Sequence, residues 1–248
     1  MCGRFPQNKR PSRYETDLDP DWGQTYLEFS PSWNVSPGRE VLVFHDNEAG
    51  HVAELLHWGF LPYWADAKAR RPINARLETA ATIPYFRRAW RVGRCVIPAD
   101  GWYEWKETPA GKVPYFIHRQ DEGSIFLAGL YEINRHENTS TFAILTTEAE
   151  GALREIHERE PVAFTAEIAR QWIRRDLSLR EVSELALVLA VRLVCLAHHF
   201  FAREQSQERW AGIWLGSVLH DRHVLERGLL LGHSGLWRFD GKAVGTAC

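Results

Sequence analysis

Six short segments of apolar or alternating residues recur through the first 150 residues, each bounded by glycine, proline or aspartate. The segments are EVLVF at 40–44, HVAELLHW at 51–58, RCVIP at 94–98, VPYFIHR at 113–119, SIFLAGLY at 124–131 and TFAILTT at 141–147. Runs of this length, with turn-forming residues at their ends, are typical of β-strands. Helical patterns are fewer, so we expect an α+β domain built on a mainly antiparallel sheet with helices at its flanks.

Two segments after these strands carry helical signals. Thr147 and Glu150 have the spacing of a capping box, which predicts a helix opening EAEGALREIH. The segment TAEIARQWIRR at 165–175 places Ile168 and Trp172 on one helical face. We therefore expect helices in both segments.

The last third of the chain has a different composition. All twelve prolines fall at or before Pro161, and five of the eleven histidines lie between His198 and His233. The run LALVLAVRLVCLAHHFF at 185–201 is apolar. Arg192 interrupts it, however, and it is shorter than the roughly 20 residues that a membrane span requires. We expect a buried helix there and no membrane partner.

Charge and cysteine content narrow the functional classes. The 248 residues carry 30 basic and 32 acidic side chains, a formal net charge of −2, so any nucleic-acid site must be a local one. The four cysteines form no CxxC pair, which argues against a zinc ribbon or a disulfide framework and fits a reducing cytoplasm. The amino terminus lacks the pattern of a signal peptide. We therefore expect a cytoplasmic monomer.

Four of the eleven tryptophans lie in two short stretches, WGFLPYW at 58–64 and WYEW at 102–105. Core packing is one explanation for them. The other is a platform on which unpaired bases stack, which needs aromatic faces beside cationic groups. Between the two stretches the chain has seven arginines: Arg70, Arg71, Arg76, Arg87, Arg88, Arg91 and Arg94. They would either supply the cationic groups of such a platform or form an ordinary solvent-exposed surface.

The opening residues MCGRF place a cysteine at position 2. Once Met1 is removed, Cys2 carries a free α-amine two carbons from its thiol, an arrangement that no internal cysteine has. Both groups are partly deprotonated and nucleophilic near neutral pH. An aldehyde that meets this pair forms an imine and then closes to a thiazolidine ring. An incidental cysteine is the alternative, and the position alone does not distinguish the two.

Seven segments stand out in order along the chain. They are MCGRF at 1–5, WNVSPG at 33–38, WGFLPYW at 58–64, NARLET at 74–79, RCVIPADGWYEW at 94–105, AGLYE at 128–132 and IHEREP at 156–161. As an ordered set they resemble the SOS-response-associated peptidase family, the abasic-site processing proteins, over residues 1–177. The resemblance implies the fold of that family, with a curved, barrel-like sheet.

The resemblance also implies a sensor of abasic sites in single-stranded DNA. Members of the family lose Met1 by their own action, a peptidase-like hydrolysis, and the exposed cysteine forms a thiazolidine DNA–protein crosslink with the ring-opened sugar. The crosslink shields the lesion from cleavage and error-prone copying, and lyase-type chemistry reverses it slowly. We expect no cofactor and no metal, and a cytoplasmic protein that joins the nucleoid when it binds DNA.

By resemblance, the catalytic residues are Cys2, Asn74, Glu104 and His157. Asn74 orients the cysteine amine. An abasic sugar is mostly a closed hemiacetal, so its opening needs an acid–base group, and Glu104 handles protons on the sugar and the amine. Histidine titrates near neutral pH, so His157 can protonate the ring oxygen or the imine and serve the reverse step. Without the resemblance, these three helpers would be a turn or strand-edge asparagine, a strand glutamate facing solvent and a helix-end histidine.

Arg4 and Arg76 match family positions that contact the DNA backbone. Guanidinium suits phosphate because it is planar, permanently charged and able to bind two oxygens at once. Gly3 would let DNA approach the reactive terminus closely, and Pro37 and Trp64 would shape the wall against which neighbouring bases stack. Backbone contacts and stacking tolerate any base, so we expect no sequence specificity.

Two features depart from the family pattern. Glu160 stands before the proline of IHEREP, where the family commonly has methionine or arginine, and would place an acid beside the pocket. From about Leu179 the chain lacks the family's final proline and PVS-like strand. We therefore divide the chain into a catalytic domain at 1–177 and an atypical segment at 178–248. One hypothesis is a shift of the reading frame, which would leave that segment poorly ordered and the sheet without an edge strand.

Three alternatives remain at this point. A class II glutamine amidotransferase also begins MCG and uses its amine to activate the thiol, but NARLET, DGWYEW and HEREP have no role in that mechanism. A non-catalytic or inactive relative would bind single-stranded DNA in a salt-sensitive way without a covalent product. The tail histidines, including HDRH at 220–223, raise the possibility of a metal site.

Overall fold

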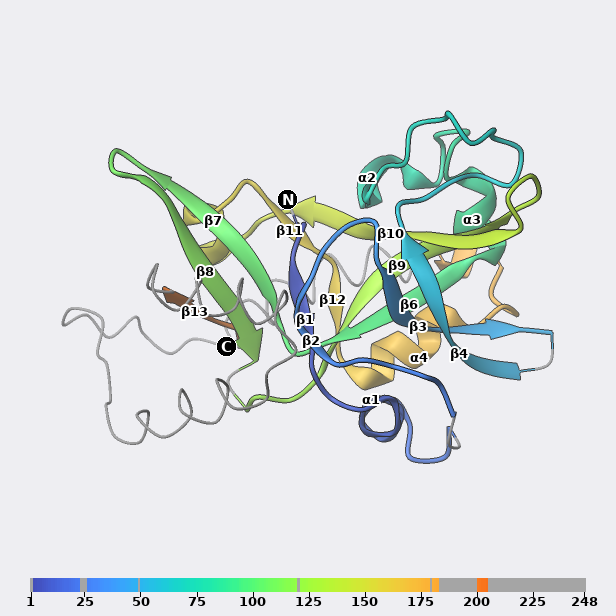
Figure 1. Ribbon diagram of the computed structural model, residues 1–248, viewed down its shortest axis with the longest axis horizontal. Coiled ribbons are helices and arrows are strands. Elements are labelled where there is room, and N and C mark those ends of the chain that lie inside the picture. The colour runs from blue at the N-terminus through green and yellow to red at the C-terminus, as the bar shows by residue number, and fades with distance from the viewer. Residues whose placement is uncertain are drawn as a thin grey trace.

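The protein is described by a computed structural model. The described residues are 2–22, 26–48, 50–119, 121–178, 180–182 and 200–204. The fold is α+β, as predicted, with a large curled mixed sheet, two smaller sheets and few helices (Figure 1). Strands form at all six of the predicted segments.

The large sheet has eight strands. In order across it lie β11 (Arg159–Pro161), β10 (Thr139–Glu148), β4 (Gly50–Trp58), β3 (Glu40–Asn47), β6 (Arg94–Ala99), β9 (Ile125–Asn134) and β12 (Ala163–Phe164), and β5 (Asn74–Arg76) pairs with β10. Because β10 pairs with both β4 and β9, the five strands β4, β3, β6, β9 and β10 close into a ring. This ring is the predicted barrel-like core. The sheet is mixed because β10 runs parallel to β4 and β5.

Two smaller sheets stand beside this ring. One pairs β1 (Phe5–Gln7) with β2 (Ser32–Val35). The other consists of β7 (Trp102–Thr108), β8 (Gly111–Arg119) and β13 (Phe200–Glu204). β13 is antiparallel to β8 along five residue pairs. The segment at 178–248 therefore contributes a strand to the fold.

The helix predicted over 185–201 falls mostly outside the described residues. Its last two residues, Phe200 and Phe201, are described, and they belong to β13 rather than to a helix. They are extended because their backbone pairs with Arg119 and His118 of β8.

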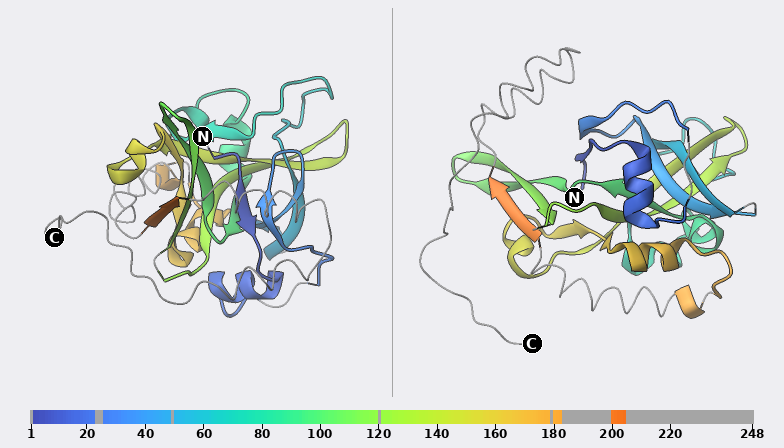
Figure 2. Two further views of the ribbon diagram at one scale, coloured as in Figure 1. Left: turned by 60° about the vertical axis from the view of Figure 1, so that its left-hand side comes forward. Right: turned by 90° about the horizontal axis from the view of Figure 1, so that it is seen from below.

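Within the described residues, the α-helices bounded in full flank the sheets. They are α1 (Pro11–Leu18), α2 (Leu77–Ala80), α3 (Arg87–Val92) and α4 (Ala166–Ile173). α4 confirms one predicted helix: the Thr165 hydroxyl caps it by accepting from the Ile168 N–H, and Ile168 and Trp172 are both buried. α1 and α4 lie together beneath the large sheet (Figures 1 and 2), and no helix within the described ranges is long and apolar enough to cross a membrane.

The other predicted helix is wrong. Thr147 is not a helix cap but a residue of β10, where it pairs with Glu160 of β11. Because this pairing extends β10 to Glu148, only a short 3-10 helix, η1 (Gly151–Glu155), follows. Glu150 precedes η1 without making a capping hydrogen bond through its side chain.

Buried side chains form two groups on opposite faces of the large sheet. Along β3, Leu42 and Phe44 belong to the group that α1, α3 and α4 cover. Val41 and Val43 point to the other face, where Cys2 lies in the second group. This alternation is the one expected for a strand buried on both faces. The amino terminus therefore lies on the face of the sheet opposite to α4.

Candidate active site at the amino terminus

Cys2 is fully buried within the second core group, directly before β1. Its backbone carbonyl accepts a hydrogen bond of 2.9 Å from Nδ2 of Asn74. In the full-length chain the nitrogen of Cys2 is in a peptide bond with Met1. The α-amine that the predicted chemistry requires becomes available only when that bond is cleaved.

Glu104 lies on β7 and is only 5% exposed. This differs from the solvent-facing position expected of an ordinary strand glutamate. The reason is that the amino-terminal segment covers β7: the Tyr103 N–H donates to the Arg4 carbonyl at 2.8 Å. Burial raises the pKa of the Cys2 thiol far above its ordinary value, and the nearby Glu104 carboxylate raises this pKa further. The Cys2 thiol is therefore protonated in this state of the protein.

Asn74 is the first residue of β5, which β10 holds in parallel register. Its Nδ2 contacts the Cys2 carbonyl, while its Oδ1 is buried and has no hydrogen-bond partner among the described residues. A buried acceptor without a donor carries a desolvation cost. The side chain thus presents a free acceptor close to the backbone of Cys2.

His157 is half-buried and follows η1. Its Nδ1 accepts a hydrogen bond of 3.0 Å from the backbone N–H of Arg159. In the neutral ring the proton therefore sits on Nε2, which makes Nε2 the donor. The adjacent Ile156 packs against the core group that contains Cys2. His157 thus stands at the margin of that group.

The predicted DNA-binding residues other than Arg76 occupy three places. Arg4 is half-buried and donates to Oδ1 of Asn34 at 3.1 Å, next to the half-buried Gly3. Pro37 is exposed after β2. Trp64 is 46% exposed and meets the ring of Tyr85 edge-on, with 5.9 Å between ring centroids. The other tryptophans of the two stretches, at 58, 102 and 105, are at least partly buried, so core packing explains them better than base stacking.

Arg76 is exposed at the end of β5 and borders an open pocket of about 270 Å³. The pocket is lined by Arg76, Glu148, Ala149, Arg154, Glu158 and Arg159. Arg159 is held in place by Glu78, with Nη1 2.8 Å from Oε1, and by the Thr146 carbonyl. Arg154 was not singled out by the sequence, where it lay inside the predicted helix. The pocket thus brings three guanidinium groups together with the carboxylates of Glu148 and Glu158.

Glu160, the acid that stands before Pro161, is buried and does not line the pocket around Arg76. Only 4% of its surface is exposed, and Oε2 has no hydrogen-bond partner among the described residues. Burial raises the pKa of this carboxyl to about 7, and the negative charge of Glu150 adds to the shift. The side chain turns inward because β11 pairs with β10 at this position.

The structure bears only in part on the metal-site alternative. In the portion of the chain that is described, no group of three or more histidine, cysteine, aspartate or glutamate side chains is placed to hold a metal ion. The histidines at 198–233, on which that alternative depends, lie outside the described residues.

Comparisons with known proteins point to one family. The profile described as SOS response associated peptidase (SRAP) matches residues 1–194. The abasic site processing protein YedK of Escherichia coli is 37% identical over 192 residues, which cover 75% of this chain and 85% of YedK. The abasic site processing protein YoqW of Bacillus subtilis is 35% identical over 179 residues, which cover 70% of this chain and 80% of YoqW.

The fold is also shared with solved structures. A phage-related protein of Bordetella bronchiseptica superposes with a TM-score of 0.67 at 31% identity, covering 83% of this chain and 95% of the phage-related protein. A protein from Bacteroides thetaiotaomicron superposes with a TM-score of 0.66 at 21% identity, covering 82% and 93% of the two chains. The second likeness concerns the fold alone.

Proposed function

Because the chain belongs to the SOS response associated peptidase family, we propose that it processes abasic sites in single-stranded DNA. It removes its own Met1 and then captures the ring-opened sugar through Cys2 as a thiazolidine crosslink, which it reverses slowly. The observation that carries this proposal is the placement of Cys2, buried beside Glu104 with its carbonyl bonded to Asn74.

The reaction begins with opening of the sugar. Glu104 and His157 supply the acid and base that convert the closed hemiacetal to the aldehyde. The α-amine of Cys2 then attacks the aldehyde carbon, and the carbonyl oxygen leaves as water to give an imine. Asn74 supports this step, because its unpaired Oδ1 is a ready acceptor for an N–H of the new amine. His157 protonates the imine nitrogen through Nε2.

The thiol closes the ring. Its sulfur adds to the imine carbon, its proton passes to Glu104 or the ring nitrogen, and a five-membered thiazolidine results. The order of steps follows from the protonated state of the thiol, since an amine that reacts first leaves a strong electrophile within reach of the sulfur. The reverse sequence returns the aldehyde and uses the same groups.

The DNA strand is held by contacts that do not read sequence. Arg4 and Arg76 bind phosphates, and Arg154 and Arg159 place two further guanidinium groups in the pocket that Arg76 borders. Gly3 leaves room for the sugar at the reactive terminus, while Pro37 and Trp64 stack against neighbouring bases. The protein acts as a monomer without cofactor, in the cytoplasm and at the nucleoid.

The test mixes the purified protein with a single-stranded oligonucleotide that carries one abasic site. We expect a heat-stable shifted band on a denaturing gel. Intact mass should equal that of the protein lacking Met1 plus the oligonucleotide minus one water, because imine formation releases water. The same oligonucleotide without the abasic site is the control for the substrate.

Two protein controls separate the amine from the thiol. Cys2→Ala should abolish the covalent product, and acetylation of the α-amine should do the same while the thiol stays intact. Normal crosslinking by the acetylated protein would contradict the thiazolidine. A folded protein that lacks Met1 and gives no band would support an inactive DNA-binding relative, and release of ammonia from glutamine would support an amidotransferase.

A further inference from the structure

Gln7, the last residue of β1, is inserted between two strands of the large sheet. Its side chain is 1% exposed, and Nε2 donates to the carbonyls of Leu42 at 2.9 Å and Pro98 at 2.8 Å. Oε1 accepts from the Leu42 N–H at 3.0 Å. Since Phe44 pairs with Val96, the continued register brings Leu42 opposite Pro98. Proline has no N–H to complete the ladder there, and the Gln7 amide supplies the missing groups.

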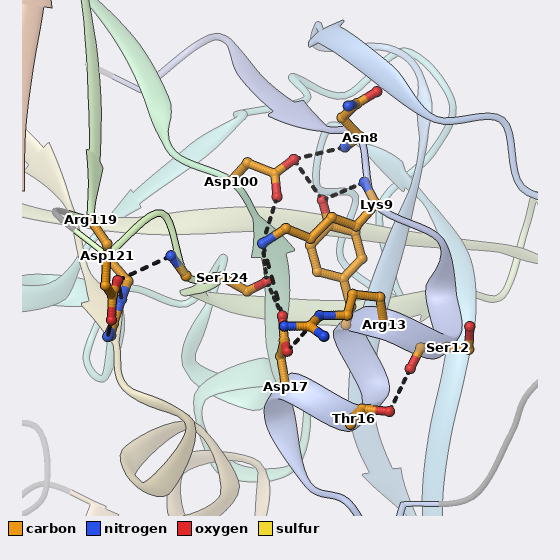
Figure 3. Close-up of polar contacts among 12 residues, drawn as sticks. Asn8, Lys9, Ser12, Arg13, Thr16, Asp17, Asp100, Arg119, Asp121 and Ser124 are labelled. Atoms are coloured by element: carbon orange, nitrogen blue, oxygen red, sulfur yellow. Dashed lines mark hydrogen bonds and ion pairs between the residues drawn. The ribbon is translucent and has the colours of Figure 1, made fainter. Parts of the chain in front are cut away.

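Asp100 holds the next part of the amino-terminal segment (Figure 3). Its Oδ2 accepts from the Asn8 N–H at 2.9 Å and from the Tyr14 hydroxyl at 3.0 Å, and its Oδ1 lies 3.2 Å from Nζ of Lys9. The Tyr14 oxygen in turn accepts from the Lys9 N–H at 3.2 Å. The backbone N–H of Asp100 donates to the Pro6 carbonyl at 3.1 Å. Asp100 thus holds the amino-terminal segment at several points between Pro6 and Tyr14.

Lys9, the cationic partner of Asp100, is itself fixed from the other side. Its Nζ donates to Oγ of Ser124 at 2.8 Å, and that hydroxyl donates to Oδ2 of Asp17 at 2.6 Å (Figure 3). Asp17 also pairs with Arg13 at 2.9 Å. The network therefore ties α1 to the residue after β6 and to the residue before β9.

The clamp formed by Gln7 and Asp100 bears on the active site through the backbone. Asp100 stands between β6 and β7, close to the Tyr103 N–H that bonds to the Arg4 carbonyl. Glu104 follows Tyr103 directly. Any shift of the amino-terminal segment along β7 would therefore change the distance between the reacting terminus and Glu104.

We propose that Gln7 and Asp100 are positioning residues for the crosslinking reaction. They fix the amino-terminal segment against the start of β7 and so keep Cys2 beside Glu104. β1 needs this support because it has only three residues and its register with β2 is irregular between Phe5 and Gln7. The inference rests on the proposed function for its chemistry but not for its structural part.

The test compares three variants with a matched control. Asp100→Asn keeps the size of the side chain but removes the charge that Lys9 faces. Tyr14→Phe removes only the hydroxyl that joins Asp100 to Lys9, and Gln7→Met removes the three amide bonds at similar length. Asp121→Asn is the control, because Asp121 accepts from Arg119 in the same region without bonding to the amino-terminal segment (Figure 3).

Three measurements are made on each protein after its folding is confirmed by thermal unfolding. They are the crosslinking rate at saturating abasic DNA, the DNA concentration at half-saturation, and the hydrogen-exchange rate of the Tyr103 amide. For Asp100→Asn and Gln7→Met we expect the saturating rate to fall about tenfold or more, because displacement of reacting groups by about 1 Å costs on the order of 100-fold. Half-saturation should not change, the Tyr103 amide should exchange faster, and Asp121→Asn should match the wild type.

Two results would overturn the proposal. The first is unchanged exchange of the Tyr103 amide in the folded variants, and the second is slower crosslinking that appears only as weaker DNA binding. If Gln7→Met does not fold, Asp100→Asn decides the outcome, and Tyr14→Phe, which removes one contact of Asp100, should change the same measurements in the same direction. If the wild type forms no crosslink, the proposed function fails, while the exchange rates still test whether the clamp sets the register of β1.

Discussion

The state of the Cys2 thiol sets the order of the proposed chemistry at the residue scale. Burial raises the pKa of the thiol, and the Glu104 carboxylate raises it further. A thiol in this state is a poor nucleophile, because the thiolate is the reactive form. An enzyme that relied on a thiolate at the first step would need the opposite environment. Before Met1 is removed the thiol is thus held protonated, and in the proposed reaction the amine reacts first and the thiol closes the ring.

Glu160 gives a prediction about stability and pH. Its pKa rises from the ordinary value of 4.5 to about 7 on folding, chiefly through burial. The folded protein thus binds this proton more tightly than the unfolded chain, so the stability that the group contributes is lost as pH rises from about 4.5 to about 7. Glu160→Gln removes the charge. We therefore expect the unfolding free energy of the variant, relative to that of the wild type, to be higher at pH 8 than at pH 4 by up to about 3 kcal/mol.

Denaturant unfolding of both proteins at pH 4, 6 and 8 measures this effect. Glu148→Gln is the matched control, because Glu148 lies on the paired strand β10 but is exposed. It should leave the pH dependence of the unfolding free energy unchanged. Parallel stability curves for the wild type and Glu160→Gln across this range would contradict the buried, proton-binding state of Glu160.

The turn between β6 and β7 leads directly into the strand that carries Glu104, so the geometry of the proposed active site depends on it. Gly101 has φ of +155°, and a Cβ atom there would lie 2.4 Å from the Ile117 carbonyl oxygen. Both the backbone conformation and the close approach exclude a side chain. We expect Gly101→Ala to lower the unfolding free energy by about 3 kcal/mol or more, since strain and a steric clash add.

Gly111→Ala separates these two causes. Gly111 starts β8 with φ of +119°, but a Cβ atom there would meet nothing within 4 Å. Strain alone should cost about 1 kcal/mol at this position. Chemical denaturation measures the unfolding free energy of both variants. Equal decreases in the two would show that the Ile117 carbonyl oxygen does not clash with a side chain at position 101.

The elements also show where sequence patterns succeed. The six strand segments and α4 were predicted because their periodicity and turn residues act locally. The capping-box prediction at Thr147 failed because β11 pairs with β10 and extends that strand through the predicted start of the helix. The pairing with β11, which follows β10 in the chain, therefore outweighed the helix cap predicted at Thr147, because such a cap stabilises a helix by only about 1 kcal/mol.

At the scale of the whole molecule, the net charge of −2 leaves DNA binding to a local group of arginines. If Arg4, Arg76, Arg154 and Arg159 each neutralise one phosphate of a single strand, the slope of log K against log salt should be about −3. Arg76→Ala should make that slope shallower by about 0.7. Binding titrations with an intact oligonucleotide at several salt concentrations measure both values.

Arg10→Ala is the control for this experiment. Arg10 is exposed directly before α1, which lies at the lower edge of the view in Figure 1, whereas α2, which directly follows Arg76, lies in its upper part. Its loss changes the net charge by the same amount and should leave the slope unchanged. If both variants shift the slope equally, binding responds to overall charge and the local pocket has no special role.

The sequence by itself predicted six of the strands, the helix α4 and the family, and it placed a cysteine at position 2. These features depend on short spacings between residues and on the order of the motifs, both of which can be read directly from the sequence. Only the tertiary structure decided that β10 closes the ring through β4 and β9, that Glu104 is buried beside Cys2, and that Glu160 turns inward. These depend on which distant strands meet, and packing, rather than local propensity, selects those partners.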